Sequence, residues 1–201
     1  MHMLTRARLL RLGATVVLGS AVAPAAARAA LPVPAPQGDD AGFLQFGVLA
    51  ERAALAFYRR AQKMPGAWTA TERGRLSAAA ARKVLHVQRL TAALGADAPA
   101  ASDYAVGLPK SAFATRPGAL KLGRRLEALL TGVYVGGVAY AADPATRLLL
   151  GRLLASDAQH LALLRQMAGL RPGAGLPDPL DLEAAGAQLD TFLKANAYPT
   201  V

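Results

Sequence analysis

Four stretches of the chain, each about 25 residues long, repeat apolar side chains every three or four positions, the spacing that lines one face of an α-helix. Pro, Gly or a capping residue separates each stretch from the next. The composition agrees, because 47 Ala and 33 Leu in 201 residues favour helix, and β-branched and aromatic residues are few. The sequence therefore predicts an all-α fold and argues against an all-β fold.

The links between these stretches predict how the helices are arranged. Residues 95–116 form a long connection, whereas the links before and after it are short. Two helical hairpins joined by one long crossover are therefore expected, since a simple up-down bundle, the alternative, needs far fewer residues there. The expected helices are Asp40–Met64, Thr69–Leu94, Pro117–Ala142 and Asp143–Leu170, then a Pro/Gly loop at 171–179 and a short amphipathic helix at Asp181–Lys194.

The N-terminus has the layout of a secretory signal. Arg6, Arg8 and Arg11 precede an apolar run from residue 12 to 27, and Ala27-Arg28-Ala29 offers a cleavage site. The arginines resemble a twin-arginine signal with Ala7 at one paired position, so the export route stays open between that system and the general one. We expect an exported protein, with an uncleaved membrane anchor as the alternative. The expected domains are a signal peptide at 1–29, a Pro-rich linker at 30–39, a four-helix bundle at 40–170 and a tail at 171–201.

The net charge and the lack of Cys exclude several kinds of partner and site. Processing after residue 29 lowers the net charge from +10 to +6, and the remaining basic residues are spread over the helix surfaces. No basic run with interleaved aromatics is present, so we expect no nucleic-acid partner, and anionic envelope polymers or lipids are the expected partners of a monomer or dimer. The absence of Cys excludes disulfides, thiolate zinc sites, iron–sulfur clusters and cysteine nucleophiles.

Charged residues interrupt the apolar face of each predicted helix near its middle. An isolated buried charge is costly, so these groups are expected to pair with one another or to bind a metal ion. They are Glu51 on the first helix, Lys83 and His86 on the second, Glu127 on the third, and Asp157 and His160 on the fourth.

The same pattern occurs twice along the chain. In each half a Glu is followed seven positions later by a Tyr and then by a His, and the Glu-to-His separations are 35 and 33 residues. Two hairpins that carry one pattern predict a site with two-fold pseudo-symmetry between them. The first set is Glu51, Tyr58 and His86, and the second is Glu127, Tyr134 and His160.

These residues resemble the ferritin-like superfamily, which includes ferritins, bacterioferritins, rubrerythrins and exported bacterial ferritin-like domains, over residues 40–170. The resemblance implies a two-metal site built from a Glu on the first and third helices and a Glu-x-x-His on the second and fourth. It assigns Glu51 and Glu127 to the terminal carboxylates, His86 and His160 to the imidazoles, and Tyr58 and Tyr134 to tyrosines beside the ligands. The two bridging glutamates fall on Lys83 and Asp157.

Those two departures change the expected chemistry. Lys83 has no lone pair while charged, so it cannot ligate a metal, and it can take one metal's place with Glu51 and Glu127 as ion-pair partners. If helix Thr69–Leu94 is rotated, Lys83 instead extends outward to solvent. Asp157 is one methylene shorter than Glu, which limits its reach. Three carboxylates against one ammonium leave two negative charges, enough to balance one divalent cation.

We therefore expect a protein that is metal-free or holds one divalent ion, iron or manganese, with a structural, binding or stress-related role in the envelope rather than an enzymatic one. An active iron or manganese metalloprotein, a ferroxidase or a peroxide-detoxifying oxidoreductase, is the alternative. A helical adaptor with a basic surface is a third hypothesis.

Overall fold

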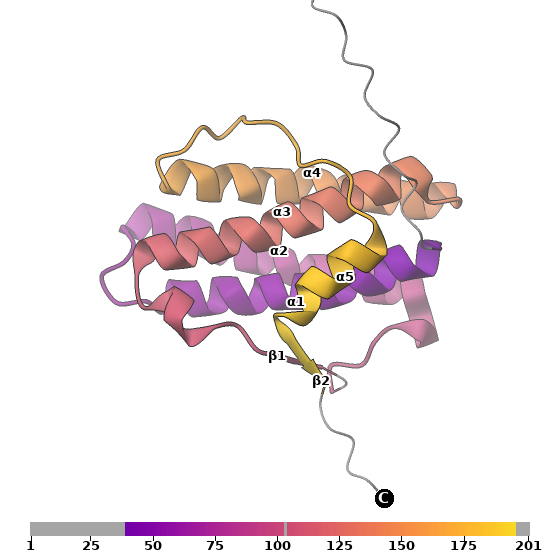
Figure 1. Cartoon of the computed structure of the whole chain (residues 1–201), viewed down its shortest axis with the longest axis horizontal. Coiled ribbons are helices and arrows are strands. Elements are labelled where there is room, and N and C mark those ends of the chain that lie inside the picture. The colour runs from indigo at the N-terminus through magenta and orange to yellow at the C-terminus, as the bar shows by residue number, and fades with distance from the viewer. Residues whose placement is uncertain (1–38, 103, 196–201) are drawn as a thin grey trace, which may run out of the picture. The chain divides into compact units, whose positions relative to one another are not determined.

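The computed structural model describes residues 39–102 and 104–195. The predicted signal peptide at 1–29 and the linker up to residue 38 lie outside the described residues. Within them the chain forms a helical bundle with a short C-terminal helix, which confirms the all-α prediction (Figure 1). The elements are α1 Asp40–Gln62, α2 Ala70–Leu94, η2 Gly95–Asp97, β1 Tyr104–Val106, η3 Lys110–Phe113, α3 Arg116–Tyr140, α4 Pro144–Met167, α5 Leu182–Asp190 and β2 Leu193–Ala195.

Local chemistry explains where the helices begin and end. The predicted capping box is present: the Thr69 side chain accepts a hydrogen bond from the Glu72 backbone, and Glu72 accepts one from Thr69. Asp143 caps α4 ahead of a Pro in its first turn. Gly95 ends α2 with a backbone φ of 59°, a value that residues other than Gly rarely adopt. Each of the four long helices begins and ends within three residues of the sequence expectation.

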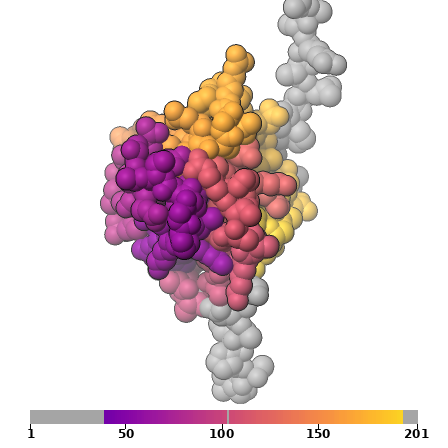
Figure 2. Space-filling view, turned by 90° about the vertical axis from the view of Figure 1, so that its left-hand side faces the viewer, coloured from indigo at the N-terminus to yellow at the C-terminus, as the bar shows by residue number. Residues whose placement is uncertain are grey.

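The four long helices form two hairpins. Helix α1 packs along α2, α3 packs along α4, and α1 also packs along α3. Figure 1 shows the crossover from α2 to α3 passing beneath α1, and Figure 2 shows the indigo-to-magenta hairpin beside the red-to-orange one. No helix among the described residues combines the length and the hydropathy that crossing a membrane requires.

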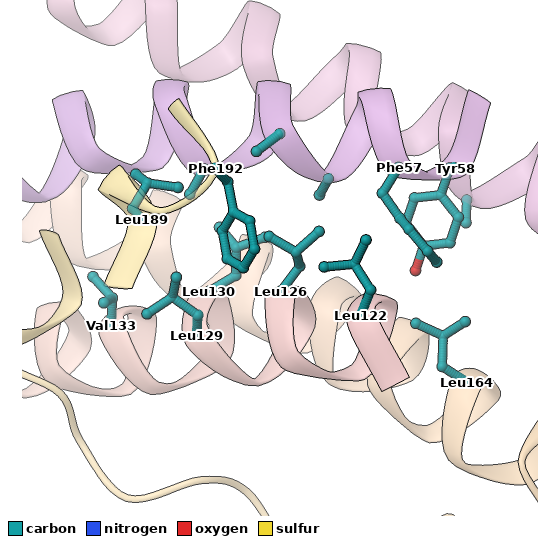
Figure 3. Packing of buried hydrophobic residues seen from close by; sticks show 14 of the residues in the cluster. Phe57, Tyr58, Leu122, Leu126, Leu129, Leu130, Val133, Leu164, Leu189 and Phe192 are labelled. Atoms are coloured by element: carbon teal, nitrogen blue, oxygen red, sulfur yellow. The ribbon is translucent and has the colours of Figure 1, made fainter. Parts of the chain in front are cut away.

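The C-terminal segment closes the open side of the α1–α3 pair. Helix α5 was expected to reach Lys194, and that expectation is wrong, because α5 ends at Asp190. The chain then turns Phe192 into the core, where it is 3% exposed, and continues as β2. Figure 3 shows Leu189 and Phe192 on the side of α3 that carries Leu126, Leu129 and Leu130.

A two-stranded antiparallel ribbon joins the tail to the crossover. Strand β1 pairs with β2 in the register Tyr104 to Ala195 and Val106 to Leu193. The Gly107 N–H also donates to the Phe192 carbonyl at 2.8 Å. The crossover therefore contains defined structure, and the ribbon holds the C-terminal tail against it.

Arg116 fastens one end of the bundle. Its guanidinium donates to both carboxylate oxygens of Glu72 at 2.7 and 3.0 Å, to the Ala67 carbonyl and to the Met167 carbonyl. It also lies 4.9 Å from the centre of the Trp68 ring. One side chain at the start of α3 therefore connects α2, the α1–α2 turn and the end of α4.

The Glu72–Arg116 pair predicts how stability depends on pH. Hydrogen bonds from Arg116 and the Thr69 backbone lower the pKa of Glu72 from 4.5 to about 2. A lowered folded-state pKa stabilises the fold above pH 4.5, and that stabilisation is lost as pH falls toward 2. Because the pair is partly exposed, Glu72→Gln is expected to cost about 1 kcal/mol at pH 7. Urea unfolding of both proteins at pH 7 and pH 2.5 measures the difference, and an equal difference at both pH values contradicts the prediction.

Candidate functional site

Each long helix places its interrupting charged residue in the interior. Glu51, Lys83, Glu127 and Asp157 are fully buried, and His86 and His160 are 1% and 9% exposed. Tyr58 and Tyr134 are also fully buried. The structure thus brings together all eight side chains that the sequence singled out. The alternative in which Lys83 extends to solvent is wrong.

Lys83 lies at the centre of this cluster. Its Nζ is 2.8 Å from Asp157 Oδ1, 2.9 Å from Glu51 Oε2 and 3.0 Å from Glu127 Oε2. Burial disfavours the charged ammonium, but the three carboxylates outweigh burial and raise the pKa of Lys83 above its ordinary value. Lys83 is therefore a buried cation that links α2 to α1, α3 and α4. The Asp157 contact is the shortest of the three, so the shorter side chain reaches the centre.

The α1–α2 side of the cluster is built on Glu51. His86 Nδ1 lies 3.0 Å from Glu51 Oε1 and 3.4 Å from Asp157 Oδ1. Tyr134, from the other hairpin, donates its hydroxyl to Glu51 Oε1 at 3.1 Å. Burial disfavours protonated His86, but the hydrogen bonds and charges of Asp157 and Glu51 outweigh it and raise the pKa of His86 to about 9. His86 is consequently a second cation in the cluster at neutral pH.

The α3–α4 side is built on Glu127 and is less completely paired. Tyr58 donates to Glu127 Oε1 at 2.7 Å, whereas His160 Nδ1 is 3.7 Å from that oxygen and 3.4 Å from Asp157 Oδ1. His160 Nδ1 and Asp157 Oδ2 are buried without a hydrogen bond. Burial raises the pKa of Glu127 despite the Lys83 charge, while Lys83 and the two His lower the pKa of Asp157 against the effect of its burial.

The two tyrosines are exchanged between the hairpins. Tyr58 of α1 donates to Glu127 of α3, and Tyr134 of α3 donates to Glu51 of α1. Each Tyr therefore lies seven residues after the Glu of its own half but donates to the Glu of the other half. The repeat in the sequence corresponds to two contacts between the hairpins. Burial and the neighbouring carboxylates raise the pKa of both tyrosines, so each remains a neutral donor.

A glycine four residues before each Glu completes the repeat, and its role was not predicted. A Cβ on Gly47 would lie 3.0 Å from Tyr134 Oη. A Cβ on Gly123 would lie 2.3 Å from Phe57 Cζ. Gly47 therefore leaves room for the Tyr134 hydroxyl that donates to Glu51, and Gly123 leaves room for the Phe57 ring next to Tyr58. The sequence does contain a sign of this role, because Gly47 and Gly123 each precede the Glu of their half by four residues.

Two groups of three residues could hold a metal ion. They are Glu51, His86 and Asp157, and Glu127, Asp157 and His160, and the ligand atoms of each group lie within 4.8 Å of one another. Both groups use Asp157, whose Oδ1 contacts the Lys83 ammonium. Carboxylate oxygen and imidazole nitrogen suit iron, manganese and other divalent ions.

Two metal ions do not fit this set of side chains. The Lys83 ammonium contacts all three carboxylates that two ions would share, and like charges at that distance repel. Three carboxylates and one ammonium leave two negative charges, and a proton on His86 leaves one. His160 Nδ1 and Asp157 Oδ2 have no hydrogen-bond partner and could ligate a single ion, whereas Glu51 Oε2, also without a hydrogen bond, contacts Lys83.

The sequence model of the ferritin-like domain family matches residues 39–170 of this chain, from the N-cap of α1 to just past the end of α4. No curated protein matches the chain. The matched region is more than half of the chain and contains all four helices that carry the cluster. The chain therefore belongs to the ferritin-like domain family.

Proposed function

We propose that the chain is an exported ferritin-like protein whose interior cluster holds at most one divalent ion, iron or manganese, because the Lys83 ammonium takes the place of the other. The observation that carries the proposal is the set of three contacts of 2.8–3.0 Å between Lys83 Nζ and the carboxylates. A bound iron or manganese would supply one-electron redox chemistry. Glu127, Asp157 and His160 would hold it.

The proposed role is structural, binding or stress-related, in the cell envelope. The Arg-flanked apolar run at the N-terminus supports export. A charge of +6 after processing supports association with anionic polymers or lipids of the envelope. The contacts of Lys83 offset one carboxylate charge, which supports a cluster that forms without a metal ion.

Metal titration of the full chain tests this proposal. Iron(II) and manganese(II) are expected to bind at no more than one ion per chain, measured by mass spectrometry of the desalted protein, and iron(II) is expected to oxidise no faster than in buffer. Lys83→Glu restores a fourth carboxylate and is expected to bind a second ion. Two tightly bound ions in the unchanged protein, with rapid iron oxidation, would overturn the proposal.

An active metal-dependent oxidoreductase is the second candidate, and the retained histidines favour it. His86 and His160 each belong to a group of three potential ligands. If the chain turns over peroxide, His160→Ala should abolish turnover together with metal binding. Turnover that survives both His86→Ala and His160→Ala would exclude the cluster as its source.

A further inference from the structure

An unusual row of arginines follows one edge of α2. Arg75, Arg82 and Arg89 are exposed and are spaced seven residues apart. Seven residues make almost two helical turns, so the three side chains leave the same edge of the helix at intervals of about 10 Å. Arg152 is likewise exposed on α4, and we call the boundary where α4 packs beside α2 the α2–α4 seam.

Among the described residues, these four arginines lack the hydrogen-bonded protein partners that several other arginines have. Within residues 39–102 and 104–195, none of the four has an acidic or carbonyl partner, whereas Arg116, Arg147 and Arg165 all donate to protein oxygens. Helices α2 and α4 contain just two carboxylates in these ranges, and both are engaged elsewhere, Glu72 with Arg116 and Asp157 with Lys83. The seam therefore presents positive charge that no acid in the described part of the chain neutralises.

A surface pocket of about 240 Å³ opens on this seam. Its lining includes the arginines Arg75 and Arg82 from α2 and the hydrogen-bonding side chains of Ser156, Gln159 and His160 from α4. It is smaller than pockets for drug-sized ligands, which measure about 300–1,000 Å³, so its size suits an ion or a small group.

His160 connects this pocket to the interior. Its ring lines the pocket, and its side chain is 11% exposed. Its Nδ1 atom is buried on the side of Asp157, so the exposed part of the ring is its other edge. The side chains of Glu51, Lys83, His86, Glu127 and Asp157 are 2% exposed or less. The pocket is thus the place where the cluster comes nearest to solvent.

We propose that this pocket binds an oxyanion of the phosphate type, free or as part of a lipid headgroup. Two guanidinium groups, a hydroxyl and an amide supply donors on both sides of the seam, and guanidinium matches tetrahedral oxyanions in geometry and charge. No carboxylate among the described residues lines the pocket to repel such a ligand. None of these donor groups belongs to the carboxylates around Lys83, so the pocket can bind an oxyanion with or without a metal ion in the interior.

Calorimetric titration of the full chain with sodium phosphate, against sodium chloride at equal ionic strength, tests the proposal. Saturable phosphate binding is expected, weakened about tenfold by either Arg75→Gln or Arg82→Gln, since each removes a charge-assisted hydrogen bond. Arg59→Gln on α1 is the matched control, because Arg59 is exposed and has the same charge. It should leave phosphate affinity unchanged.

A second arm identifies the source of the phosphate group. Flotation with phosphatidylglycerol vesicles, against phosphatidylcholine vesicles, detects a headgroup ligand, and the same two variants should weaken it while Arg59→Gln does not. Binding in either arm with this pattern of variants supports the proposal. No saturable binding in either arm, or equal weakening by Arg59→Gln, overturns it.

Discussion

Replacing Lys83 with Met is expected to destabilise the protein by about 3–5 kcal/mol at pH 7, the cost of removing one partner from a buried ionic network. The substitution keeps an unbranched side chain, one atom shorter than Lys, but leaves Glu51, Glu127 and Asp157 buried without their shared cation. The cost should decrease as pH falls, because protonation of the carboxylates removes their mutual repulsion. Equilibrium unfolding in urea between pH 4 and pH 8 measures both effects.

Two comparisons separate this effect from a general loss of a lysine. Lys121→Met changes an exposed position of α3 and should alter stability by less than about 0.5 kcal/mol. Manganese(II) should stabilise Lys83→Met more than it stabilises the unchanged protein, because the metal can replace the missing positive charge. A Lys83→Met protein that is as stable as the unchanged one at pH 7 without metal would show that Lys83 does not compensate the carboxylates.

Replacing Gly123 with Ala is expected to destabilise the protein by about 2 kcal/mol, as overpacking of a filled core does. The added Cβ would lie 2.3 Å from Phe57 Cζ and 2.6 Å from Phe57 Cε1. Phe57 cannot move away freely, since its ring packs against Tyr58 at 5.0 Å and Phe113 at 6.0 Å between ring centres. Thermal and urea unfolding measure the loss.

A Gly→Ala substitution at a position with free space around it should raise stability instead of lowering it. A Cβ on Gly74 of α2 meets nothing within 4 Å, so Gly74→Ala is expected to stabilise by about 0.5–1 kcal/mol through helix propensity. Phe57→Leu removes atoms next to Gly123, and the double variant should be more stable than the two single losses predict. Strict additivity of the two would contradict the proposed clash.

The main features of the bundle could be predicted from local signals. Periodicity located the four long helices, and the capping box at Thr69 and the Pro after Asp143 fixed two of their starts. The end of α5 was missed because the residues after Asp190 follow contacts that are distant in sequence. Their backbone pairs with β1, about 90 residues earlier, and Phe192 packs against α3. No local propensity reports such a pairing.

The cluster could be predicted as a set of residues but not as an arrangement. The spacing of Glu51, Lys83 and Glu127 on apolar faces predicted that they meet, because a buried charge needs a partner. Asp157 was the residue whose reach was in question, and its distance of 2.8 Å to Lys83 depends on how closely α2 and α4 approach, which the pattern of one helix does not contain. Gly47 was missed for the same reason, because the atoms it makes room for belong to Tyr134 of α3.

The exchange of tyrosines between the hairpins has a consequence for folding. If only the α1–α2 hairpin were formed, Glu51 would lack the hydroxyl of Tyr134, and Tyr58 would lack the carboxylate of Glu127. The same holds for the α3–α4 hairpin, so neither half can complete its interior without the other. A chain with either hairpin formed alone is therefore disfavoured. The bundle should fold and unfold as a single cooperative unit.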